Sequence, residues 1–573
     1  MIFTIIVWLY ITFISYSIGS GLHRILRLSN VHFSLTCISG LVVLGFLSTF
    51  LCLFTPLAAL TSLSMLMLAV LSWVVYGKSI RLGLKKDWPL FENRFIIVAF
   101  CLYVIAISYF SYVPSTHHDD GLYYSTSIRW LQEYGTVKGL CNVNARIGFN
   151  SAWLILQAAL GFQFLHAGLF NDLSGLLYLY LLIYFLNGVG ALLKKDYSPP
   201  ALLRALFFIG LLTLYTGAGS QILLYNVNQL SSGSADLPVC MMTWLIFLLF
   251  VERRTLPAEG FHRKDLLILF YSMFLITMKV SAVPILLLSG FVLLQLSRRN
   301  GMKKALLAAG VCILLVAPWF IRNVMVSGYL VFPFSGVDIF NVDWKIPLEN
   351  VRYHENVIKV FAIDPQADLS RPFNASLREW VPAWFLRLAF IQQVIFSLTI
   401  LISLVFCGTG LTALVRRDYS FLGRNERYIV FILTAVAGTL FWLEKGPDFR
   451  FGYGFMGVYC SLGLALFLDV VVRNRKRLIA PVIIVLCYAV LPNYADEFKY
   501  MIRDLFKLPL QPPQPLEIVK VPLNEGVIMN VVTHDDCWNG PLPIALSNEF
   551  DYVRPVLRGH TIREGFKASV QTH

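Results

Sequence analysis

Charged side chains are scarce in this chain of 573 residues. They make up 14% of the sequence, whereas apolar residues make up 57%, and the mean hydropathy is +0.67. In soluble globular chains about a quarter of the residues are charged, so this composition excludes a soluble protein. Long uncharged runs recur instead, and many could cross a hydrocarbon layer of about 30 Å. We predict an all-α, polytopic transmembrane bundle, because the short alternating segments of a β-barrel are missing.

Three other features are missing, and each excludes a function class. No basic, aromatic-interleaved soluble domain accompanies the net charge of +14, so we expect no nucleic-acid partner. No glycine-rich phosphate loop is present, which argues against cytosolic ATP or a nucleotide sugar as substrate. No internal repeat is visible, which weakens the interpretation as an inverted-repeat transporter.

Cysteine gives no sign of a disulfide framework. Most of the ten cysteines lie in apolar runs, where thiols are usually inert core side chains. Only Cys141 and Cys537 fall in polar segments, and they could pair if both face an oxidising compartment. The first apolar run, 1–20, has neither a basic n-region nor a cleavage site, so we expect a retained helix.

The apolar runs predict about 14 membrane spans. They lie near 1–20, 33–53, 57–76, 95–113, 172–193, 200–217, 236–251, 265–280, 281–297, 305–321, 385–409, 427–443, 453–472 and 478–493. The basic loops between them all fall on one side, the cytoplasmic side, if the apolar stretch 152–170 does not cross. Its Gln157, Gln163 and His166 suit a re-entrant or interfacial helix on the outer face.

This topology divides the chain into three parts. Residues 1–94 form an N-terminal three-helix membrane segment, and residues 95–491 form the transmembrane core, with outer loops 114–171 and 322–384. Residues 492–573 form a small extracytoplasmic segment, proline-rich at first and then mixed enough for a few short strands. Its low apolar density indicates a cap and not an independent catalytic domain.

The most informative segment is Ser115-Thr-His-His-Asp-Asp-Gly-Leu-Tyr-Tyr124. Its carboxylates, Asp119 and Asp120, follow directly on an apolar run, where charge is costly and usually functional. They offer a base or a metal ligand, although Asp before Gly is also ordinary turn chemistry. For His118 we favour a polar lining role over metal ligation, because adjacent histidines rarely point alike.

Further unusual charges fall at the same membrane level under this topology. They are Arg146, Asp236, Lys279, Arg322, Asp448 and Arg450. The positive-inside bias should deplete cations at outer span ends. An anionic ligand there explains them, since arginine matches phosphate oxygens and lysine adds a compact charge.

Each of these charges also has a structural interpretation. Lys279 could reach the interface with no other role, and Asp236 could cap its helix. Arg322 or Arg450 could be the partner of an acid such as Asp448. The joint placement favours one pocket on the outer face.

The residues described above resemble the GT-C superfamily of polytopic glycosyltransferases. Asp119 and Asp120 look like the acidic motif of its first large outer loop, and two further segments, Pro318-Trp-Phe-Ile-Arg-Asn323 and 231–238, look like related stretches. This resemblance covers roughly 95–492. Nearly the whole chain also resembles an uncharacterised group of bacterial multipass proteins, for which no substrate is settled.

The resemblance implies a membrane glycosyltransferase that takes a sugar from a polyprenyl-phosphate donor. Asp119 or Asp120 would take the acceptor proton, directly or through a divalent cation, Mg²⁺ or Mn²⁺, and no other cofactor is indicated. Arg322, Arg450 and Lys279 would hold the phosphate, and Tyr124 could stack on a sugar. The expected partners are the lipid-linked donor and membrane lipids, at the outer face of a bacterial inner membrane.

Two departures and two alternatives stay open. Acidic pairs of GT-C enzymes are often separated by one residue, whereas Asp119 and Asp120 adjoin, so either aspartate could act. Three helices precede the core without an assigned role. The alternatives are a transporter or flippase of lipid-linked saccharide, and a polymerase or ligase of surface polysaccharide. The cytoplasmic halves of the spans hold few acids or bases, which favours an enzyme.

Overall fold

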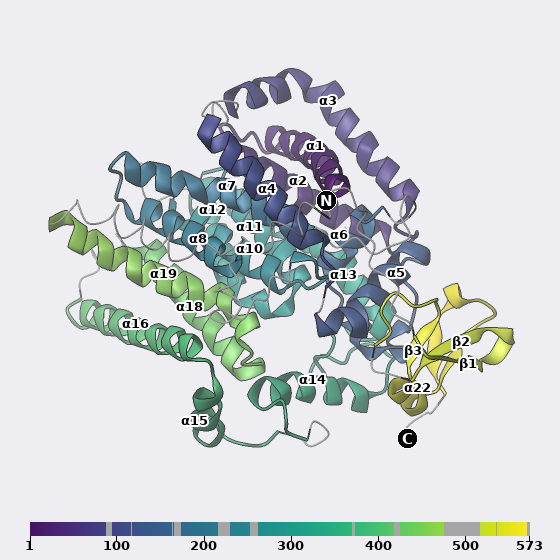
Figure 1. Cartoon of the computed structure of the whole chain (residues 1–573). Coiled ribbons are helices and arrows are strands. Elements are labelled where there is room, and N and C mark those ends of the chain that lie inside the picture. Colours follow the sequence, from purple (N-terminus) through teal and green to yellow (C-terminus); the bar gives the residue numbers. More distant parts are fainter. Residues whose placement is uncertain are drawn as a thin grey trace.

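The fold is a helical membrane bundle with a small cap at one end (Figure 1). The computed structural model describes residues 1–87, 94–115, 117–162, 164, 173–215, 230–252, 262–368, 373–417, 425–474, 503, 516–533 and 536–569. Within these ranges, nine helices are long and apolar enough to cross a membrane. The chain is thus an integral, multi-pass, mostly helical protein.

The N-terminal helices are built into the bundle. They are α1 (Ile2–Ile25), α2 (Phe33–Leu51), α3 (Ala59–Asp87) and α4 (Arg94–Tyr112). Helices α1 and α2 meet backbone to backbone: a Cβ added at Gly40 would clash with the Ser15 carbonyl oxygen, and one at Gly19 would clash with that of Thr36. Such small-residue contacts are a usual way for membrane helices to associate. Because α2 also contacts α6, α7 and α11, these helices support the core directly.

The first outer loop folds into short helices. A single π-helical turn (Asp120–Tyr124) leads into α5 (Ser125–Glu133), two 3-10 turns (Leu140–Asn142 and Ala145–Gly148) and α6 (Ala152–Leu160). With nine residues, α6 is only about 13 Å long, too short to cross a membrane by itself. All nine residues are buried in the protein, and Gln157 donates to the Gly233 carbonyl, which favours the re-entrant over the interfacial alternative. Gln163 and His166 lie outside the described residues.

Helix α10 (Asp236–Glu252) lies at the centre of the bundle. It is apolar all round and buried over nearly its whole length, as expected of a helix with no face toward solvent. Its neighbours are α7 (Leu173–Leu193), α8 (Pro199–Tyr215), α11 (Asp265–Met278), α18 (Glu426–Lys445) and α19 (Phe449–Asn474). The chain breaks after α11 at the extended residue Lys279, and a 3-10 turn (Val280–Ile285) leads into α12 (Leu286–Asn300).

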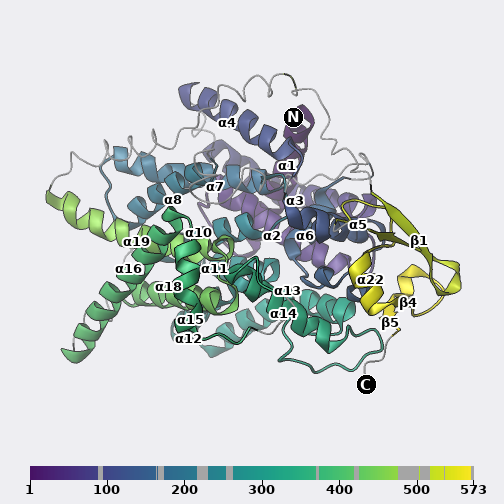
Figure 2. The ribbon, with the colours of Figure 1, turned by 60° about the horizontal axis from the view of Figure 1, so that its bottom comes forward.

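The remaining helices surround this centre. They are α13 (Met302–Ser327), α14 (Leu348–Ile363), α15 (Leu377–Arg387) and α16 (Phe390–Val415). Helix α16 stands at the edge of the bundle (Figure 2) and is largely exposed despite its apolar sequence, which suits a lipid-facing helix. Each predicted span up to 453–472 falls on a helix. The last one, 478–493, lies outside the described residues.

The C-terminal cap contains the short strands that the sequence predicts. Strand β2 (Ile528–Val532) pairs antiparallel with β1 (Ile518–Pro522) and parallel with β3 (Ile544–Leu546). Helix α22 (Ser547–Val553) follows, and then the pair β4 (Pro555–Leu557) and β5 (Phe566–Ala568). The cap shares a hydrophobic cluster with the first outer loop that includes Trp130 and Phe566. Cys141 and Cys537 are buried and free, so they do not form a disulfide.

Candidate functional site

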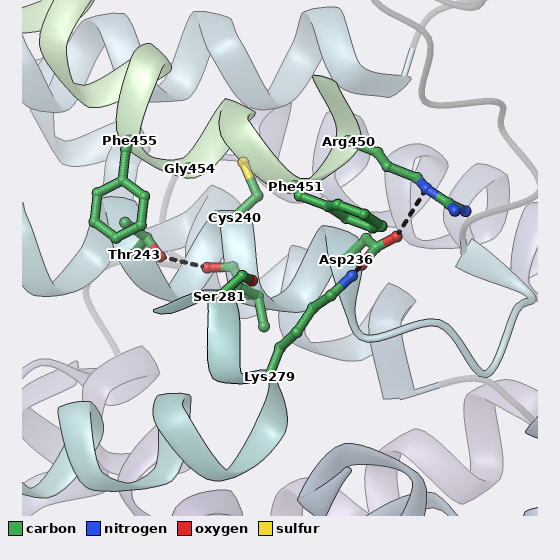
Figure 3. Close-up of a pocket in the computed structure, with 10 residues that line it drawn as sticks. Asp236, Cys240, Thr243, Lys279, Ser281, Arg450, Phe451, Gly454 and Phe455 are labelled. Atoms are coloured by element: carbon green, nitrogen blue, oxygen red, sulfur yellow. Dashed lines mark hydrogen bonds and ion pairs between the residues drawn. The ribbon is translucent and has the colours of Figure 1, made fainter. Parts of the chain in front are cut away.

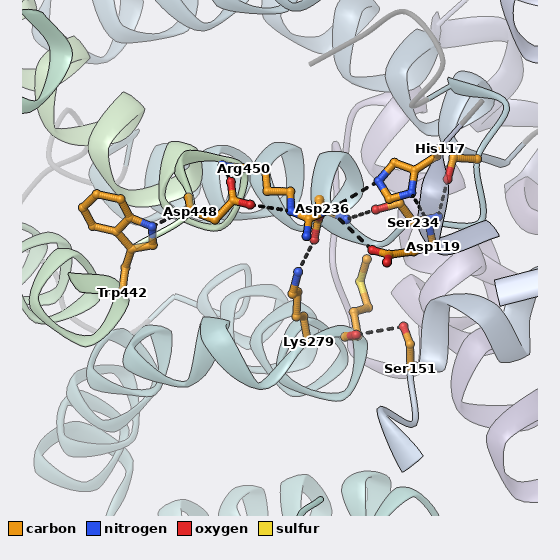
Figure 4. Close-up of polar contacts among 11 residues, drawn as sticks. His117, Asp119, Ser151, Ser234, Asp236, Lys279, Trp442, Asp448 and Arg450 are labelled. Atoms are coloured by element: carbon orange, nitrogen blue, oxygen red, sulfur yellow. Dashed lines mark hydrogen bonds and ion pairs between the residues drawn. The ribbon is translucent and has the colours of Figure 1, made fainter. Parts of the chain in front are cut away.

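Asp236, the first residue of α10, is the buried anchor of a charge cluster (Figure 4). Its backbone N–H donates to the Ser234 hydroxyl, so the segment before α10 caps the helix. The Asp236 carboxylate forms an ion pair with the Lys279 ammonium and lies 3.8 Å from Nε of Arg450. The sequence suggested that Asp236 could cap its helix. In the structure Ser234 accepts the N–H at the helix start, and the Asp236 side chain contacts cations instead.

Arg450 connects three separate segments of the chain. Its Nε lies 2.9 Å from Oδ2 of Asp448, and its NH1 lies 3.4 Å from Oδ2 of Asp119 and 3.5 Å from Nε2 of His117. Asp448 is fixed in turn, because it accepts the Arg450 backbone N–H and its carbonyl accepts the Trp442 indole N–H at 2.6 Å. The start of α19 thereby binds both α10 and the loop after α4.

Lys279 reaches the cluster because the chain breaks at its position. Its extended backbone, with φ −156° and ψ 129°, ends α11 and turns the side chain toward α10. The ammonium lies 3.5 Å from the centre of the Phe451 ring, and the Arg450 guanidinium lies 4.8 Å from the same ring. Contact with one aromatic face stabilises both cations where water is scarce.

A pocket opens beside these charges, between α10, α19 and the 3-10 turn after Lys279 (Figure 3). Asp236, Lys279 and Arg450 line its polar end, and Val239 and Phe455 line an apolar part. The lining follows α10 from Asp236 to Thr243, which is about 10 Å along the helix axis. This lining combines charged, polar and apolar groups.

The cluster is not simply a positive site. It contains two cations, Lys279 and Arg450, and three carboxylates, Asp119, Asp236 and Asp448. With a neutral His117 the formal charge is therefore −1. An anionic group that binds Arg450 at Nε or NH1 competes with the carboxylates that lie there now.

The two adjacent aspartates have different environments. The Asp120 side chain is buried: Ser115 Oγ donates to Oδ2 at 2.5 Å, and the Gly233 N–H donates to Oδ1 at 2.9 Å. Burial raises the pKa of Asp120, against the opposing effects of His117 and of these donors. The Asp119 side chain is 21% exposed and faces Arg450. Asp120 thus ties the loop to the segment before α10, and Asp119 is available for chemistry.

His117, not His118, is the histidine that lies in this cluster. Besides its approach to Arg450, His117 accepts the Asp119 backbone N–H on Nδ1 at 3.2 Å, whereas His118 is exposed. Tyr124 is buried, with its ring 4.4 Å from that of Tyr123. It packs under the site and does not offer an open stacking face.

Two predicted site residues lie elsewhere. Arg146 pairs with Glu549 of the cap at 2.5 Å. Arg322 is buried and donates to the side-chain oxygen of Asn150, so it supports the first outer loop. Neither residue lines the pocket. The structure therefore brings Asp119, Asp236, Lys279, Asp448 and Arg450 together, and leaves Arg322 out of the expected phosphate contacts.

The donors of this cluster do not form a metal site. Across the described residues, no group of three or more His, Cys, Asp or Glu side chains could hold a metal ion. Asp119 and Asp448 share the guanidinium of Arg450, so both carboxylates already have a cationic partner. The involvement of Mg²⁺ or Mn²⁺ therefore stays a prediction.

The sequence did not indicate several residues of the site, among them three with clear roles. Phe451 contacts both cations, Ser281 lines the pocket, and Trp442 holds the Asp448 backbone. Apolar and aromatic residues are common at membrane interfaces, so nothing in their sequence context distinguished them. Only the adjacency of Phe451 to Arg450 was a usable signal.

Comparisons with known proteins place the chain in a family. A search of curated proteins and a search of solved structures each give no match. One family matches residues 1–457, a range that includes Asp119, Asp236, Lys279 and Arg450 and ends before the cap. The chain therefore belongs to the family described as a domain of unknown function, DUF8201.

Proposed function

We propose that this protein is a GT-C-type membrane glycosyltransferase. It would move a sugar from a polyprenyl-phosphate donor to an acceptor on the extracytoplasmic face of a bacterial inner membrane. One observation carries the proposal. The Asp119 carboxylate, from the loop after α4, lies 3.4 Å from the guanidinium of Arg450, which lines an amphipathic pocket together with Lys279.

The transfer step follows from this geometry. The acceptor oxygen attacks the anomeric carbon, its proton passes to Asp119, and the bond from the anomeric carbon to the phosphate oxygen breaks. The lipid phosphate leaves with the electron pair and gains one negative charge, while Asp119 loses one. The charge of the site with its substrates is therefore unchanged, and a positioned base of this kind contributes about 10²- to 10⁴-fold to the rate.

Arg450 is well placed to follow this movement of charge. It is shared among Asp119, Asp448 and Asp236. As Asp119 becomes neutral, its hold on the guanidinium weakens, and the charge developing on the phosphate can replace it. An interaction that strengthens during the reaction lowers the barrier, whereas one of constant strength does not. Lys279 supplies a second cation beside the pocket.

The apolar part of the pocket supports a lipid-linked donor. Val239, Cys240 and Phe455 continue the lining away from the charges. A lipid phosphate has its charge directly attached to an apolar chain, so its two parts match the two parts of this lining. A water-soluble phosphate ester would leave the apolar surface without a contact.

One observation favours the transporter alternative. Charged pairs also lie at the opposite ends of the central helices, Arg204 with Glu252 and Arg427 with Asp265, although the sequence indicated few such charges. A transporter presents its site to both sides of the membrane in turn. These pairs do not line the described pocket, so an enzyme remains the proposal.

Reconstitution into liposomes separates transfer from transport. The purified protein would receive polyprenyl phosphates that carry different radiolabelled sugars, together with a membrane extract that supplies acceptor hydroxyl groups. Two products would be measured: free polyprenyl phosphate, and intact donor in the opposite leaflet. We expect release of polyprenyl phosphate from at least one donor, and a loss of more than 100-fold in Asp119→Asn. Glu252→Gln, at the other end of α10, is the matched control and should retain the rate.

Two outcomes would contradict the proposal. Movement of intact donor across the bilayer without release of polyprenyl phosphate would establish transport. Release that continues at the wild-type rate in Asp119→Asn would remove Asp119 from the chemistry. A polymerase or ligase would release the same lipid phosphate, but only from donors that carry oligosaccharides.

A further inference from the structure

We infer that the C-terminal cap is part of the working site, because residues 536–540 hold the Asp119-bearing turn in its position beside Arg450. The catalytic importance of Asp119 in that position rests on the proposed function. The contact itself does not, since the cap and the turn meet in the structure whatever reaction follows. The cap lies outside the part of the chain that matches the family.

Backbone hydrogen bonds join the cap directly to the π-helical turn after Asp119. The carbonyl of Gly121 accepts the N–H of Cys537 at 2.9 Å and the N–H of Trp538 at 2.9 Å. Asp119 is the residue that precedes this turn. A shift of the 537–538 backbone therefore moves the segment from which the Asp119 side chain projects.

Side chains of α5 hold the same cap segment from the other direction. The Thr126 hydroxyl donates to the Trp538 carbonyl at 2.8 Å. NH1 of Arg129 donates to the carbonyls of Asn539 at 2.6 Å and Gly540 at 2.8 Å, and its Nε is paired with Glu133 at 2.6 Å. Both backbone groups of Trp538 are thus bound by the turn and α5.

Unusual backbone conformations meet at this contact. Trp538 has φ +39°, which is rare and strained for a bulky residue. Residues 120–124 form a π-helix, a feature that is frequent at functional sites. Strained conformations persist where the surrounding contacts over-determine them, and the hydrogen bonds to Gly121 and Thr126 do so here.

Gly121 is needed because the cap packs against its bare Cα. An added Cβ would lie 2.5 Å from the Asp536 carboxylate and 3.0 Å from the Trp538 ring. The φ of Gly121 is not positive, so the position does not require glycine for its backbone conformation. In the sequence, Asp120 and Gly121 look like an ordinary turn. In the structure, the missing side chain of Gly121 lets the cap pack closely against the turn.

The other edge of the first outer loop is held in the same way. Glu549 of α22 accepts the Ala145 N–H at 2.8 Å and pairs with Arg146 at 2.5 Å. The Phe566 N–H donates to the Lys138 carbonyl at 2.9 Å. The cap therefore holds the loop at both edges, and a catalytic group misplaced by about 1 Å can lose about 100-fold in rate.

A compensating pair of substitutions tests the contact in the full-length protein. Gly121→Ala should lower kcat for sugar transfer by at least 30-fold, with KM for the donor unchanged within two-fold, because Asp119 is displaced while the pocket is intact. Adding Asp536→Gly removes the nearer clash and should restore at least ten-fold. Gly290→Ala in α12 is the control, because an added Cβ there meets nothing within 4 Å.

The outcomes separate positioning from folding. Rates are compared per molecule of protein that elutes as a monodisperse peak in detergent. A Gly121→Ala variant with wild-type kcat, or one whose loss Asp536→Gly does not reverse, would overturn the inference. A rise in donor KM with unchanged kcat would also overturn it.

A second measurement does not depend on any glycosyl transfer. In membranes that contain full-length Asp119→Cys, mass spectrometry follows how fast a thiol reagent modifies residue 119. Adding Arg129→Gln removes the donor to Asn539 and Gly540 and should raise that rate at least five-fold. An unchanged rate would overturn the inference. If this rate rises while no donor reacts with the wild-type protein, the positioning stands and the proposed function fails.

Discussion

The two ends of α10 both carry a carboxylate, and they are organised differently. At the far end, Glu252 accepts from Tyr184 at 2.9 Å and from Arg204 Nε at 3.0 Å, so each of its oxygens has its own donor. At the near end, one guanidinium, that of Arg450, lies between three carboxylates at 2.9, 3.4 and 3.8 Å. Only the near end adjoins the pocket.

This difference shows how a structural ion pair is distinguished from a site. A buried pair that satisfies its own hydrogen bonds has nothing to offer a substrate, and the loss of only one of its partners lowers stability. A cation shared by several acids can be reassigned with little rearrangement. Buried charge alone therefore does not distinguish the two ends of α10, whereas the sharing of Arg450 beside a pocket does.

Replacing one arginine near each end of α10 should produce the largest difference in turnover. Arg450→Gln leaves three carboxylates with one cation and removes the group facing the phosphate, so transfer should fall by about 10³-fold. Arg427→Gln removes the partner of Asp265 at the far end and should cost about 3 kcal/mol of stability, with unchanged kcat. Turnover per folded molecule and thermal unfolding in detergent measure the two effects. Equal losses of turnover would break the comparison.

Apolar replacements sharpen the comparison further. Lys279→Met keeps the contact with Phe451 but removes the charge paired with Asp236, and we expect transfer to fall by about 30-fold, a smaller loss than for Arg450. The double variant Arg204→Met with Glu252→Met removes a whole pair and should change stability by less than about 1 kcal/mol. Turnover and unfolding are measured as before. A turnover loss in the double variant that matches that of Lys279→Met would contradict this interpretation.

Acid should lower the stability of the folded protein. Burial lowers the pKa of His354, in α14, to about 3, and Arg146 adds to this effect. Below its usual value of 6.5 the unfolded chain binds a proton that the folded chain does not, so stability falls as the pH falls. At pH 5 this amounts to about 2 kcal/mol relative to neutral pH.

The matched variant for this pH effect is His354→Phe, which suits the aromatic contacts with Phe149 and Phe332. The difference in unfolding free energy between wild type and variant, followed from pH 7 to pH 5, isolates the histidine. Burial raises the pKa of Glu549, an effect of opposite sign that both proteins share. A difference that does not change with pH would show that His354 is not buried as a neutral group.

The smallest expected effect separates the two histidines. His118→Ala should leave transfer within two-fold of wild type, because the side chain is exposed. His117→Ala removes the group near Arg450 and the acceptor for the Asp119 N–H, and should lower transfer by about five-fold. Initial rates at saturating donor compare them. The reverse order would contradict the placement of the loop.

The sequence predicts the helices that carry these charges better than it predicts which charges meet. Apolar runs marked α10 from Asp236 onward and the break at Lys279, because a span has a required length and few charges. Arg322, which the sequence predicts at the same level as the other charges, contacts Asn150 instead. Which way a side chain faces around its helix depends on packing between distant segments, and topology does not contain that information.

The sequence also does not show which of two identical adjacent residues belongs to the site. Asp119 and Asp120 are indistinguishable by composition and position, and so are His117 and His118. What separates them is the approach of Ser115 and Gly233 to Asp120, which depends on how the segment before α10 meets the loop after α4. The cap's contact with Gly121 joins residues more than four hundred positions apart, and no local pattern predicts it.

The most direct test replaces each aspartate of the pair singly with asparagine and measures polyprenyl phosphate release by each full-length variant. In Asp120→Asn the new side-chain amide can still accept the Gly233 N–H, and the Ser115 hydroxyl can rotate to accept from that amide, so this variant should keep at least a third of the wild-type rate. Asp119→Asn loses the proton acceptor and should retain less than about 1%. Equal rates in the two variants, or the opposite order, would contradict the assignment of Asp119 as the base.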